Sequence, residues 1–321
     1  MSPTWLNTTL NGTQPSGCHQ SSAEKLGLTF TYCLLMIASL AGNTFSGIIV
    51  YRTESMRKPI NFLIVNMAMS DLLYPVFVFP RFLSSLYVDY WLITGPLGQA
   101  LCKLACFLPR VSIVVSIQSL VLIAVDRFGA VVFPLRSPLI SSKLCPFLIL
   151  ATWIIAMAVQ SPYLFAYKLF ECQGGLVCDR RWKEVFGESS SYSNYLLPIL
   201  MIFCFIPLVL IAILYVIIYI KLKSQKIPGE QSANAGQQRQ QRERNVLKMA
   251  IAIVLGFAVC CLPFSIYWFL WFFVSDIRSF CGFQYFANFA FFMVHINCAT
   301  NPCICIIFSK NYRIGLKNLF R

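Results

Sequence analysis

The sequence predicts an all-α membrane protein, in which a bundle of seven transmembrane helices is followed by a short C-terminal amphipathic helix. Its 321 residues are 58% hydrophobic and only 12% charged, whereas soluble domains carry about 25% charged residues. The apolar residues gather in runs longer than the ~20 residues with which a helix crosses a bilayer. These runs are continuous rather than alternating, which favours helices over the strands of a barrel.

Seven segments are long and apolar enough to span a membrane. Five of them contain long runs without Asp, Glu, Lys or Arg, while the second and third carry isolated charges such as Asp71 and Arg110. The expected bounds of the seven helices are 25–51, 58–86, 98–132, 141–167, 191–225, 238–274 and 282–308. Residues 1–24 then form an extracellular tail and 25–309 the bundle. Basic and apolar residues alternate in 310–321, which predicts a cytoplasmic amphipathic helix in contact with membrane lipid.

The distribution of Lys and Arg predicts the orientation of the chain. Four segments expected on one side together hold 17 of the 26 basic residues: 51–58, 127–143, 221–248 and 310–321. The positive-inside rule places this side in the cytoplasm. The N-terminal tail is then outside the cell, where Asn7 and Asn11 begin two glycosylation sequons. The tail lacks the apolar region of a signal peptide, so the first helix is expected to act as an uncleaved membrane signal. This asymmetry accounts for the net charge of +14 without a nucleic-acid partner.

Five of the fourteen cysteines are expected on the outer side: Cys18, Cys102, Cys172, Cys178 and Cys281. An oxidising exterior permits disulfides between them. Cys102 begins the third helix, and either Cys172 or Cys178 could pair with it. A bridge between Cys18 and Cys281 is a second candidate. An odd number of outer cysteines leaves the pairing open.

Polar residues recur inside the apolar helices, at Asn43, Asp71, Ser116, Asn297 and Asn301. A buried carboxylate needs a partner or must take up a proton. Ser116, Asn297 and Asn301 could surround Asp71 with oxygens and amides, which would suit a small hydrated cation such as sodium. A hydrogen-bonded network without any ion is the alternative, and both remain open.

Over about residues 25–320, the chain resembles the rhodopsin-like (class A) G-protein-coupled receptors. Within that family it is most similar in character to the neuropeptide receptors. The matching pieces, in order, are GN at 42–43, NMAMSDLL at 66–73, Trp91 before Cys102, DRF at 126–128, Trp153, Pro207 with Tyr215, Glu243, Phe257, LP at 262–263 and NP at 301–302. The resemblance implies a plasma-membrane receptor with an extracellular ligand. It also implies that heterotrimeric G proteins and arrestin bind the cytoplasmic face.

The resemblance also implies roles for individual residues. Arg127 would pair at rest with Asp126 and, across the bundle, with Glu243, and would be released toward the G protein on activation. Residues that resemble the family's activation packing are Ile117, Pro207, Tyr215, Phe257, Cys261, Pro263, Asn301, Pro302 and Cys305. Two of them depart from the family pattern, because Cys261 stands where most members have Trp and Cys305 where most have Tyr.

The outer disulfide and the loop that carries it also follow from the resemblance. Trp182 follows Cys178 at the family spacing, which favours Cys178 as the partner of Cys102. The loop CQGGLVCDRRW looks like the two-stranded hairpin that lies over the pockets of peptide receptors.

Several ligand classes are excluded by single positions. A retinal receptor of this family needs a lysine in the seventh helix, and residues 282–308 contain none. An amine receptor would carry an aspartate where Pro109 stands. A transporter, the remote alternative, would be expected to show repeated halves or a polar pore stripe, and the sequence shows neither. No nucleophile–base constellation or metal-spaced Cys/His cluster is present, so we expect a non-enzyme without a cofactor other than the sodium ion.

Peptide and lipid ligands remain. The residues expected to line the pocket are Pro109, Arg110, Phe264, Trp268, Phe291 and His295. The aromatic residues suit peptide side chains. The outer acids would suit a basic peptide: Asp89, Glu171, Asp179, Glu184, Glu188 and Asp276. Arg110 would instead suit the carboxylate of a fatty acid or of a peptide C-terminus, unless it pairs with a local acid. We favour a neuropeptide-type ligand, with a lipid or other small carboxylate as the alternative.

Overall fold

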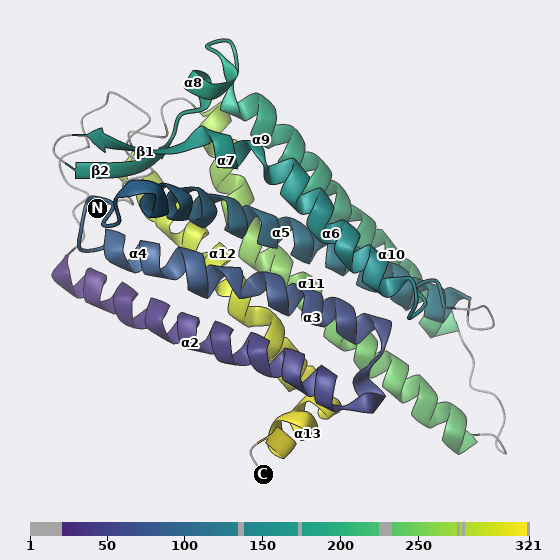
Figure 1. Ribbon diagram of the computed structural model, residues 1–321. Coiled ribbons are helices and arrows are strands. Elements are labelled where there is room, and N and C mark those ends of the chain that lie inside the picture. The colour runs from purple at the N-terminus through teal and green to yellow at the C-terminus, as the bar shows by residue number, and fades with distance from the viewer. Residues whose placement is uncertain are drawn as a thin grey trace.

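The computed structural model contains seven helices long and apolar enough to cross a membrane within its described residues, gathered into one elongated bundle (Figure 1). The structure describes residues 21–133, 138–172, 175–224, 233–274, 277 and 280–319, and of 224, 233–246 and 281 the backbone alone. The predicted fold class is thereby confirmed. Predictions for the Asn7 and Asn11 sequons, for a bridge between Cys18 and Cys281, and for the side chain of Glu243 lie outside the described residues.

The spans follow the apolar runs of the sequence. They are formed by α2 (Ser22–Arg52), α3 with α4 (Pro59–Asp71 and Phe79–Ser85), α5 (Gly95–Val132), α6 with α7 (Cys145–Gln160 and Pro162–Ala166), α9 with α10 (Tyr192–Leu200 and Ile206–Ser224), α11 (Ala233–Phe273) and α12 (Cys281–Phe308). A capping box begins α2, where the Ser21 hydroxyl accepts from the backbone N–H of Glu24 and the Glu24 carboxylate accepts from that of Ser21. The fourth span begins at Cys145, later than the expected 141, and α11 extends back to Ala233.

Two of the spans contain a π-helical turn that the sequence analysis did not predict. The turns are η2 (Tyr74–Val78) in the second span and η3 (Met201–Phe205) in the fifth. In each, a backbone N–H donates five residues back, from Phe79 to Tyr74 and from Ile206 to Met201, and the donor is followed by a proline. Because proline has no N–H to continue the α-helical ladder, the chain pairs with the longer spacing at these points.

A β-hairpin covers one end of the bundle, which we call the outer end. Strands β1 (Tyr167–Cys172) and β2 (Gly175–Arg180) are antiparallel, with Leu169 opposite Cys178. The short helix α8 (Trp182–Phe186) follows. Gln99 of α5 fixes β1, because its amide oxygen accepts from the Leu169 N–H at 2.9 Å and its amide nitrogen donates to the Tyr167 carbonyl at 3.3 Å.

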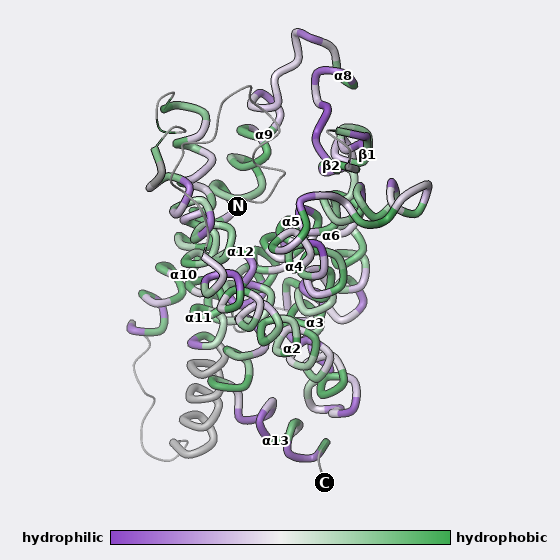
Figure 2. Tube along the Cα trace, turned by 90° about the vertical axis from the view of Figure 1, so that its left-hand side faces the viewer, coloured by the Kyte–Doolittle hydropathy of each residue, from purple (hydrophilic) through white to green (hydrophobic). Residues whose placement is uncertain are grey.

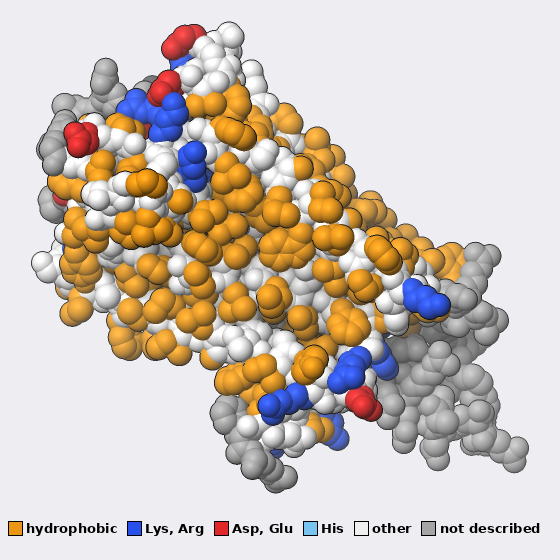
Figure 3. Space-filling view, in the orientation of Figure 1, with side chains coloured by type: hydrophobic (Ala, Val, Ile, Leu, Met, Phe, Trp, Pro, Cys, Tyr) orange, Lys and Arg blue, Asp and Glu red, His pale blue; other side chains and the backbone are white. Residues whose placement is uncertain are grey.

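The opposite, inner end carries α13 (Lys310–Leu319), which runs across the bundle axis (Figure 1). Tyr312 and Gly315 of α13 are buried against the bundle. Between the two ends, hydrophobic side chains cover the visible flank, while charged side chains gather near the ends (Figure 3). Figure 2 shows the same division along the chain, with hydrophobic helices between a hydrophilic hairpin region and α13. Exposed apolar side chains such as Phe147, Ile154 and Val216 would face lipid in a membrane.

Helix α5 lies at the centre and packs against α3, α6, α7 and α10. The hydrophobic core divides along it into an inner cluster around Leu120 and Ile123 and an outer cluster around Val111 and Val115. The first and last spans also approach closely at Gly42. A Cβ at that position would lie only 2.8 Å from Pro302 Cγ. Only glycine allows that separation without a shift of either helix.

Candidate ligand-binding site

The outer half of the bundle encloses a cavity of about 200 Å³, bounded by η2, α4, α5, α6, α7, α9, η3, α11, α12 and the β-hairpin. All six residues expected to line a pocket do line it: Pro109, Arg110, Phe264, Trp268, Phe291 and His295. They come from three different spans, so the fold brings together residues that are far apart in the sequence. Their roles in binding a ligand stay predictions.

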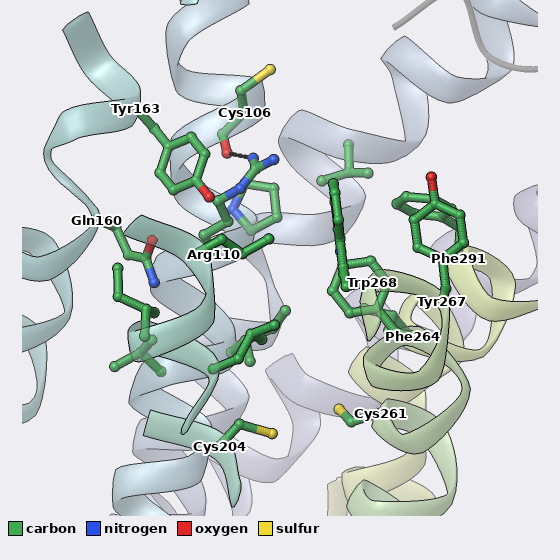
Figure 4. A pocket seen from close by; sticks show the side chains of 18 of the residues that line it. Cys106, Arg110, Gln160, Tyr163, Cys204, Cys261, Phe264, Tyr267, Trp268 and Phe291 are labelled. Atoms are coloured by element: carbon green, nitrogen blue, oxygen red, sulfur yellow. Dashed lines mark hydrogen bonds between the residues drawn. The ribbon is translucent and has the colours of Figure 1, made fainter. Parts of the chain in front are cut away.

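The cavity has two unlike walls (Figure 4). One side carries Arg110 of α5, Tyr163 of α7 and Gln160 of α6, whereas the facing side carries the aromatic residues of α11 and α12. The thiols of Cys204 and Cys261 lie at the lower end. The cavity is therefore polar and cationic on one side and aromatic on the other.

Arg110 is held by neutral groups. Its guanidinium carbon lies 4.1 Å from the ring centre of Tyr163 and 5.6 Å from that of Tyr167. One terminal nitrogen donates to the Cys106 carbonyl oxygen, and the other lies 3.3 Å from the Tyr167 hydroxyl. Burial raises the pKa of the Tyr167 hydroxyl, so this group is neutral near pH 7. Among the described residues, no carboxylate oxygen lies within 4.0 Å of Arg110.

Two further arginines, which the sequence analysis did not place here, also line the cavity. Arg81 donates to the Cys106 sulfur at 2.7 Å and lies 5.4 Å from the ring centre of Trp91. Arg180 of β2 lies 3.5 Å from the ring centre of Tyr192. The isolated charge of Arg81 in an apolar segment was the signal that could have identified it.

The expected set of outer acids is mostly directed elsewhere. Of the five that the structure describes, only Asp179 lines this cavity, where it is buried. Glu184 accepts from Lys168 at 2.6 Å, an interaction that lowers the pKa of the Glu184 carboxyl, and Glu188 lies 3.9 Å from Lys183. Asp276 lies outside the described residues. The cavity itself thus holds three arginines and one aspartate among its described lining residues.

The aromatic wall is built from edge-to-face contacts. Phe264 packs against Phe291 with ring centres 5.2 Å apart, and against Trp268 at 6.1 Å. His295, also buried, shares a hydrogen bond of 2.8 Å with the Tyr32 hydroxyl through Nδ1. Another aromatic residue of α12, Phe289, is half exposed. Geometry of this kind fixes ring orientations and leaves a rigid apolar surface.

A disulfide joins the hairpin to α5 above the cavity. Cys102 and Cys178 are bonded, with their Cα atoms 5.7 Å apart, whereas Cys172 is a free thiol. This resolves the alternative left open by the cysteine count and confirms Cys178 as the partner. Because Asp179 and Arg180 follow Cys178 directly, the bond also fixes the hairpin residues that line the cavity.

A second polar cluster lies deeper in the bundle. Asn301 donates to Asp71 Oδ2 at 2.9 Å, and the hydroxyl of Ser116 lies 3.2 Å from that of Ser70. Asn43 donates instead to the carbonyl oxygens of Ser39 and Cys298. Four side-chain oxygens of this cluster are buried without a hydrogen-bond partner among the described residues: Oδ1 of Asn43, Asp71, Asn297 and Asn301. The expected groups are present, and Asn301 donates directly to the carboxylate.

Sequence reasoning missed a neighbouring network around Asn66. Its amide nitrogen donates to Ser119 at 2.9 Å and to Thr152 at 3.2 Å, and its oxygen accepts from Trp153 Nε1 at 2.8 Å. These bonds tie α3, α5 and α6 together. A polar residue five positions before Asp71 in an apolar helix was the available signal.

At the inner end, Arg127 donates through Nε and Nη2 to Oδ2 of the adjacent Asp126. The Asp126 side chain is 7% exposed and that of Arg127 20%, so the pair lies at the edge of the core. Residues of the expected activation packing lie above it in one cluster, namely Ile117, Tyr215, Phe257, Cys261 and Cys305. Pro207 is partly buried, outside that cluster, while Pro263 and Pro302 lie inside α11 and α12.

The comparisons with known proteins agree with this arrangement. The family model "7 transmembrane receptor (rhodopsin family)" matches residues 42–304. The human neuromedin-K receptor is 28% identical over 319 residues, which cover 99% of this chain and 65% of that receptor. The human substance-K receptor is 29% identical over 90% of this chain and 71% of its own length. A QRFP-like peptide receptor of Branchiostoma floridae is 28% identical, over 93% of this chain and 78% of its own.

The chain therefore belongs to the rhodopsin family of seven-transmembrane receptors. It spans slightly less than two thirds of the length of the neuromedin-K receptors that it matches. Membership in this family, together with seven apolar helices, makes it a multi-pass protein of the plasma membrane. The family is one of receptors, which supports the expectation of a non-enzyme.

Proposed function

Since the chain is a rhodopsin-family member, we propose that it binds an extracellular peptide in the outer cavity and activates heterotrimeric G proteins at its inner face. The observation that carries the proposal is the cavity itself, lined by rigid aromatic rings and by a hairpin that a disulfide fixes to α5. Relatives named as receptors for neuromedin K, substance K and QRFP-like peptides support a peptide ligand.

A ligand in this cavity would contact residues that also pack in the core toward the inner end of the bundle. Ile117 and Cys261 line the cavity and also belong to the inner core cluster, together with Phe257. A change in their packing would alter the preferred position of α11 against α5. Release of Arg127 from its local pair would then expose a cation to the G protein, and arrestin would use the same face. Only a ligand that binds the two arrangements with different affinity can cause this shift.

A sodium ion is proposed as a regulator within the same bundle. Sodium prefers oxygen ligands, and the buried Oδ1 atoms of Asn43, Asp71, Asn297 and Asn301 are acceptors without donors among the described residues. A buried carboxylate without full compensation is costly, and a cation beside Asp71 would offset that cost. In this proposal the ion binds the resting receptor and leaves as the helices close.

A second candidate ligand class is a fatty acid or other small carboxylate. The observation that favours it is Arg110, which lines the cavity (Figure 4) and whose two hydrogen-bond partners among the described residues are neutral. Membrane lipid is also a proposed partner at α13. This helix carries the basic residues Lys310, Arg313 and Lys317 in addition to the residues that it buries against the bundle.

A second-messenger screen of the expressed receptor tests the proposal. Cells would be exposed to peptides with free and amidated C-termini, to amines and to lipids, with surface expression measured in parallel. We expect a response to a peptide and none in cells that carry Arg127→Ala. Responses to lipids alone would favour the second candidate. No response to any class at normal surface expression would contradict the receptor function.

A further inference from the structure

We infer that the ligand presents a carboxylate attached to an apolar body, and that Arg110 binds this carboxylate while the aromatic wall binds the body. The inference rests on the proposed receptor function and deepens it by naming the chemistry of the ligand end that enters the cavity. A peptide with a free C-terminal aromatic residue has this chemistry, and so has a fatty acid.

Arg110 carries a charge that no carboxylate compensates within 4.0 Å among the described residues. It lies within the membrane span Gly95–Val132, where an ionised side chain is costly unless it is paired or used for binding. Its partners within the described structure are the carbonyl of Cys106, the hydroxyl of Tyr167 and the ring of Tyr163, all without formal charge. Among the described residues, the chain therefore holds this buried cation in place without a carboxylate oxygen within 4.0 Å.

Arg110 retains N–H donors that its described partners do not use. A guanidinium has five N–H groups in a planar fork, and the two hydrogen bonds of Arg110 in the described structure use one terminal nitrogen each. Donors are left for a carboxylate, which matches the fork with two parallel bonds. The Tyr163 ring, 4.1 Å from the guanidinium carbon, fixes the plane of the fork before any ligand arrives. Preorganisation of this kind reduces the entropy lost on binding.

The charged side chains that line the cavity are mostly positive among the described residues. Arg81 and Arg180 lie on its wall together with Arg110, and Asp179 is the one acid among the described lining residues. Like charges across a desolvated interface oppose binding, and opposite charges favour it. The cavity thus favours an anionic ligand end over the basic peptide that the outer acids of the sequence suggested.

The cavity is small and has two unlike walls. Its volume is about 200 Å³, and an engineered apolar cavity of about 150 Å³ holds one benzene molecule. The space therefore accepts a ring-sized group with a carboxylate rather than a whole peptide. Phe264, Trp268 and Phe291 lie opposite Arg110 (Figure 4), so one ligand end can meet both walls at once.

The experiment measures binding of two matched probes to the full-length receptor in lipid nanodiscs. N-acetyl-phenylalanine and N-acetyl-phenylalaninamide have nearly the same shape and differ in charge. Their affinities would be read from the shift of the thermal unfolding midpoint with probe concentration. We expect the acid to bind about ten- to a hundredfold more tightly than the amide, because hydrogen bonds to charged groups contribute that much. Decanoate against decanamide forms a second arm, and the tighter acid identifies the peptide-like or the fatty-acid source.

Variants assign the preference to one side chain. Arg110→Gln should reduce the acid-to-amide ratio to about one, and Arg110→Lys should restore part of it. Lys103→Gln removes a cation from the same helix outside the cavity lining and should leave the ratio unchanged. The unfolding midpoint without probe should not fall in Arg110→Gln, because the change removes a buried charge that lacks a counter-charge.

Equal affinities of acid and amide in the wild type would overturn the inference, as would an acid that does not bind at millimolar concentration. An undiminished preference in Arg110→Gln would overturn it as well. The assay contains no G protein. A receptor that prefers the acid but never raises a second messenger would therefore refute the proposed function and leave the carboxylate site standing.

Discussion

Two arginines on α5 hold their charges in opposite ways. Arg127, near the inner end, donates to the carboxylate of its neighbour Asp126. Arg110 lies seventeen positions earlier, about 26 Å away at the ~1.5 Å rise of a helix. It has aromatic rings and a carbonyl around it, and no carboxylate within 4.0 Å among the described residues. The same helix thus carries one cation paired with a carboxylate of the chain and one with no carboxylate beside it among the described residues, which we propose is paired by a ligand.

The surroundings of Arg110 are more rigidly fixed than those of Arg127. At the outer end, the Cys102–Cys178 disulfide, the hairpin and the stacked rings hold Arg110 in one place. At the inner end, Arg127 is held by an ion pair at the edge of the core, which in partly hydrated surroundings is worth about 1 kcal/mol. The comparison indicates that the outer region is built to keep its geometry and the inner region to change partners.

Breaking the covalent link of the outer region should have the largest effect. In Cys102→Ala the hairpin residues that line the cavity lose their anchor, and loss of a native disulfide commonly costs about 2–5 kcal/mol. We expect surface expression or ligand response to be lost, as measured by flow cytometry and second-messenger assay. Cys178→Ala should behave alike. The free thiol of Cys172 provides the matched control, since Cys172→Ala should retain both properties.

The polar cluster between the two arginines offers the next largest effect. If sodium binds beside Asp71, raising sodium should weaken agonist binding by roughly fivefold or more, within the usual range of coupling between sites. Asp71→Asn removes the charge and should remove the dependence. Potassium replaces sodium at constant ionic strength, which keeps general screening the same. Equal sodium dependence in both proteins would favour a plain hydrogen-bonded network at Asp71, Asn297 and Asn301.

Much of the fold could be predicted because a bilayer imposes a simple requirement. Each crossing needs a long continuous apolar run, and such runs are visible in a single sequence. The cavity residues from Pro109 to His295 could be predicted to meet because they lie in the outer halves of their segments, and helices of one bundle share that level. The pairing of Cys102 with Cys178 came from the family spacing to Trp182.

What could not be predicted depends on the rotation and local distortion of the helices. The π turns at η2 and η3 arise where the backbone re-pairs before Pro80 and Pro207. A distortion of this kind changes which side chains point inward after it, and composition carries no record of that change. Composition therefore does not show that Arg81 faces the cavity. Nor does it show that no carboxylate among the described residues lies beside Arg110. A sequence shows that a charge is buried but not which neighbour it faces.

The inner pair predicts a more modest effect. The Glu243 side chain lies outside the described residues, so its contact with Arg127 stays a prediction. If the contact holds the resting state, Glu243→Ala should raise signalling without ligand about fivefold, the change that ~1 kcal/mol produces. Arg127→Ala should lower both basal and ligand-driven output, because the arginine also engages the G protein. Output would be normalised to surface expression. Unchanged basal output in the first variant together with full signalling in the second would make the pair a solvated helix end.

The smallest expected effect concerns Cys305, above the inner pair. Cys305 is fully buried in the cluster that contains Tyr215, whose hydroxyl has no hydrogen-bond partner among the described residues. Cys305→Tyr would add a hydroxyl that could bond to the hydroxyl of Tyr215 in the active arrangement. Because a net hydrogen bond contributes ~1 kcal/mol, this bond should raise the maximal agonist response severalfold at most. The comparison that isolates the bond is a double-mutant cycle with Tyr215→Phe. We expect the gain from Cys305→Tyr to disappear when Tyr215 is already Phe. An equal gain in both backgrounds would show that the tyrosine acts through its bulk, and the inner region would then owe its bias to packing rather than to exchangeable polar partners.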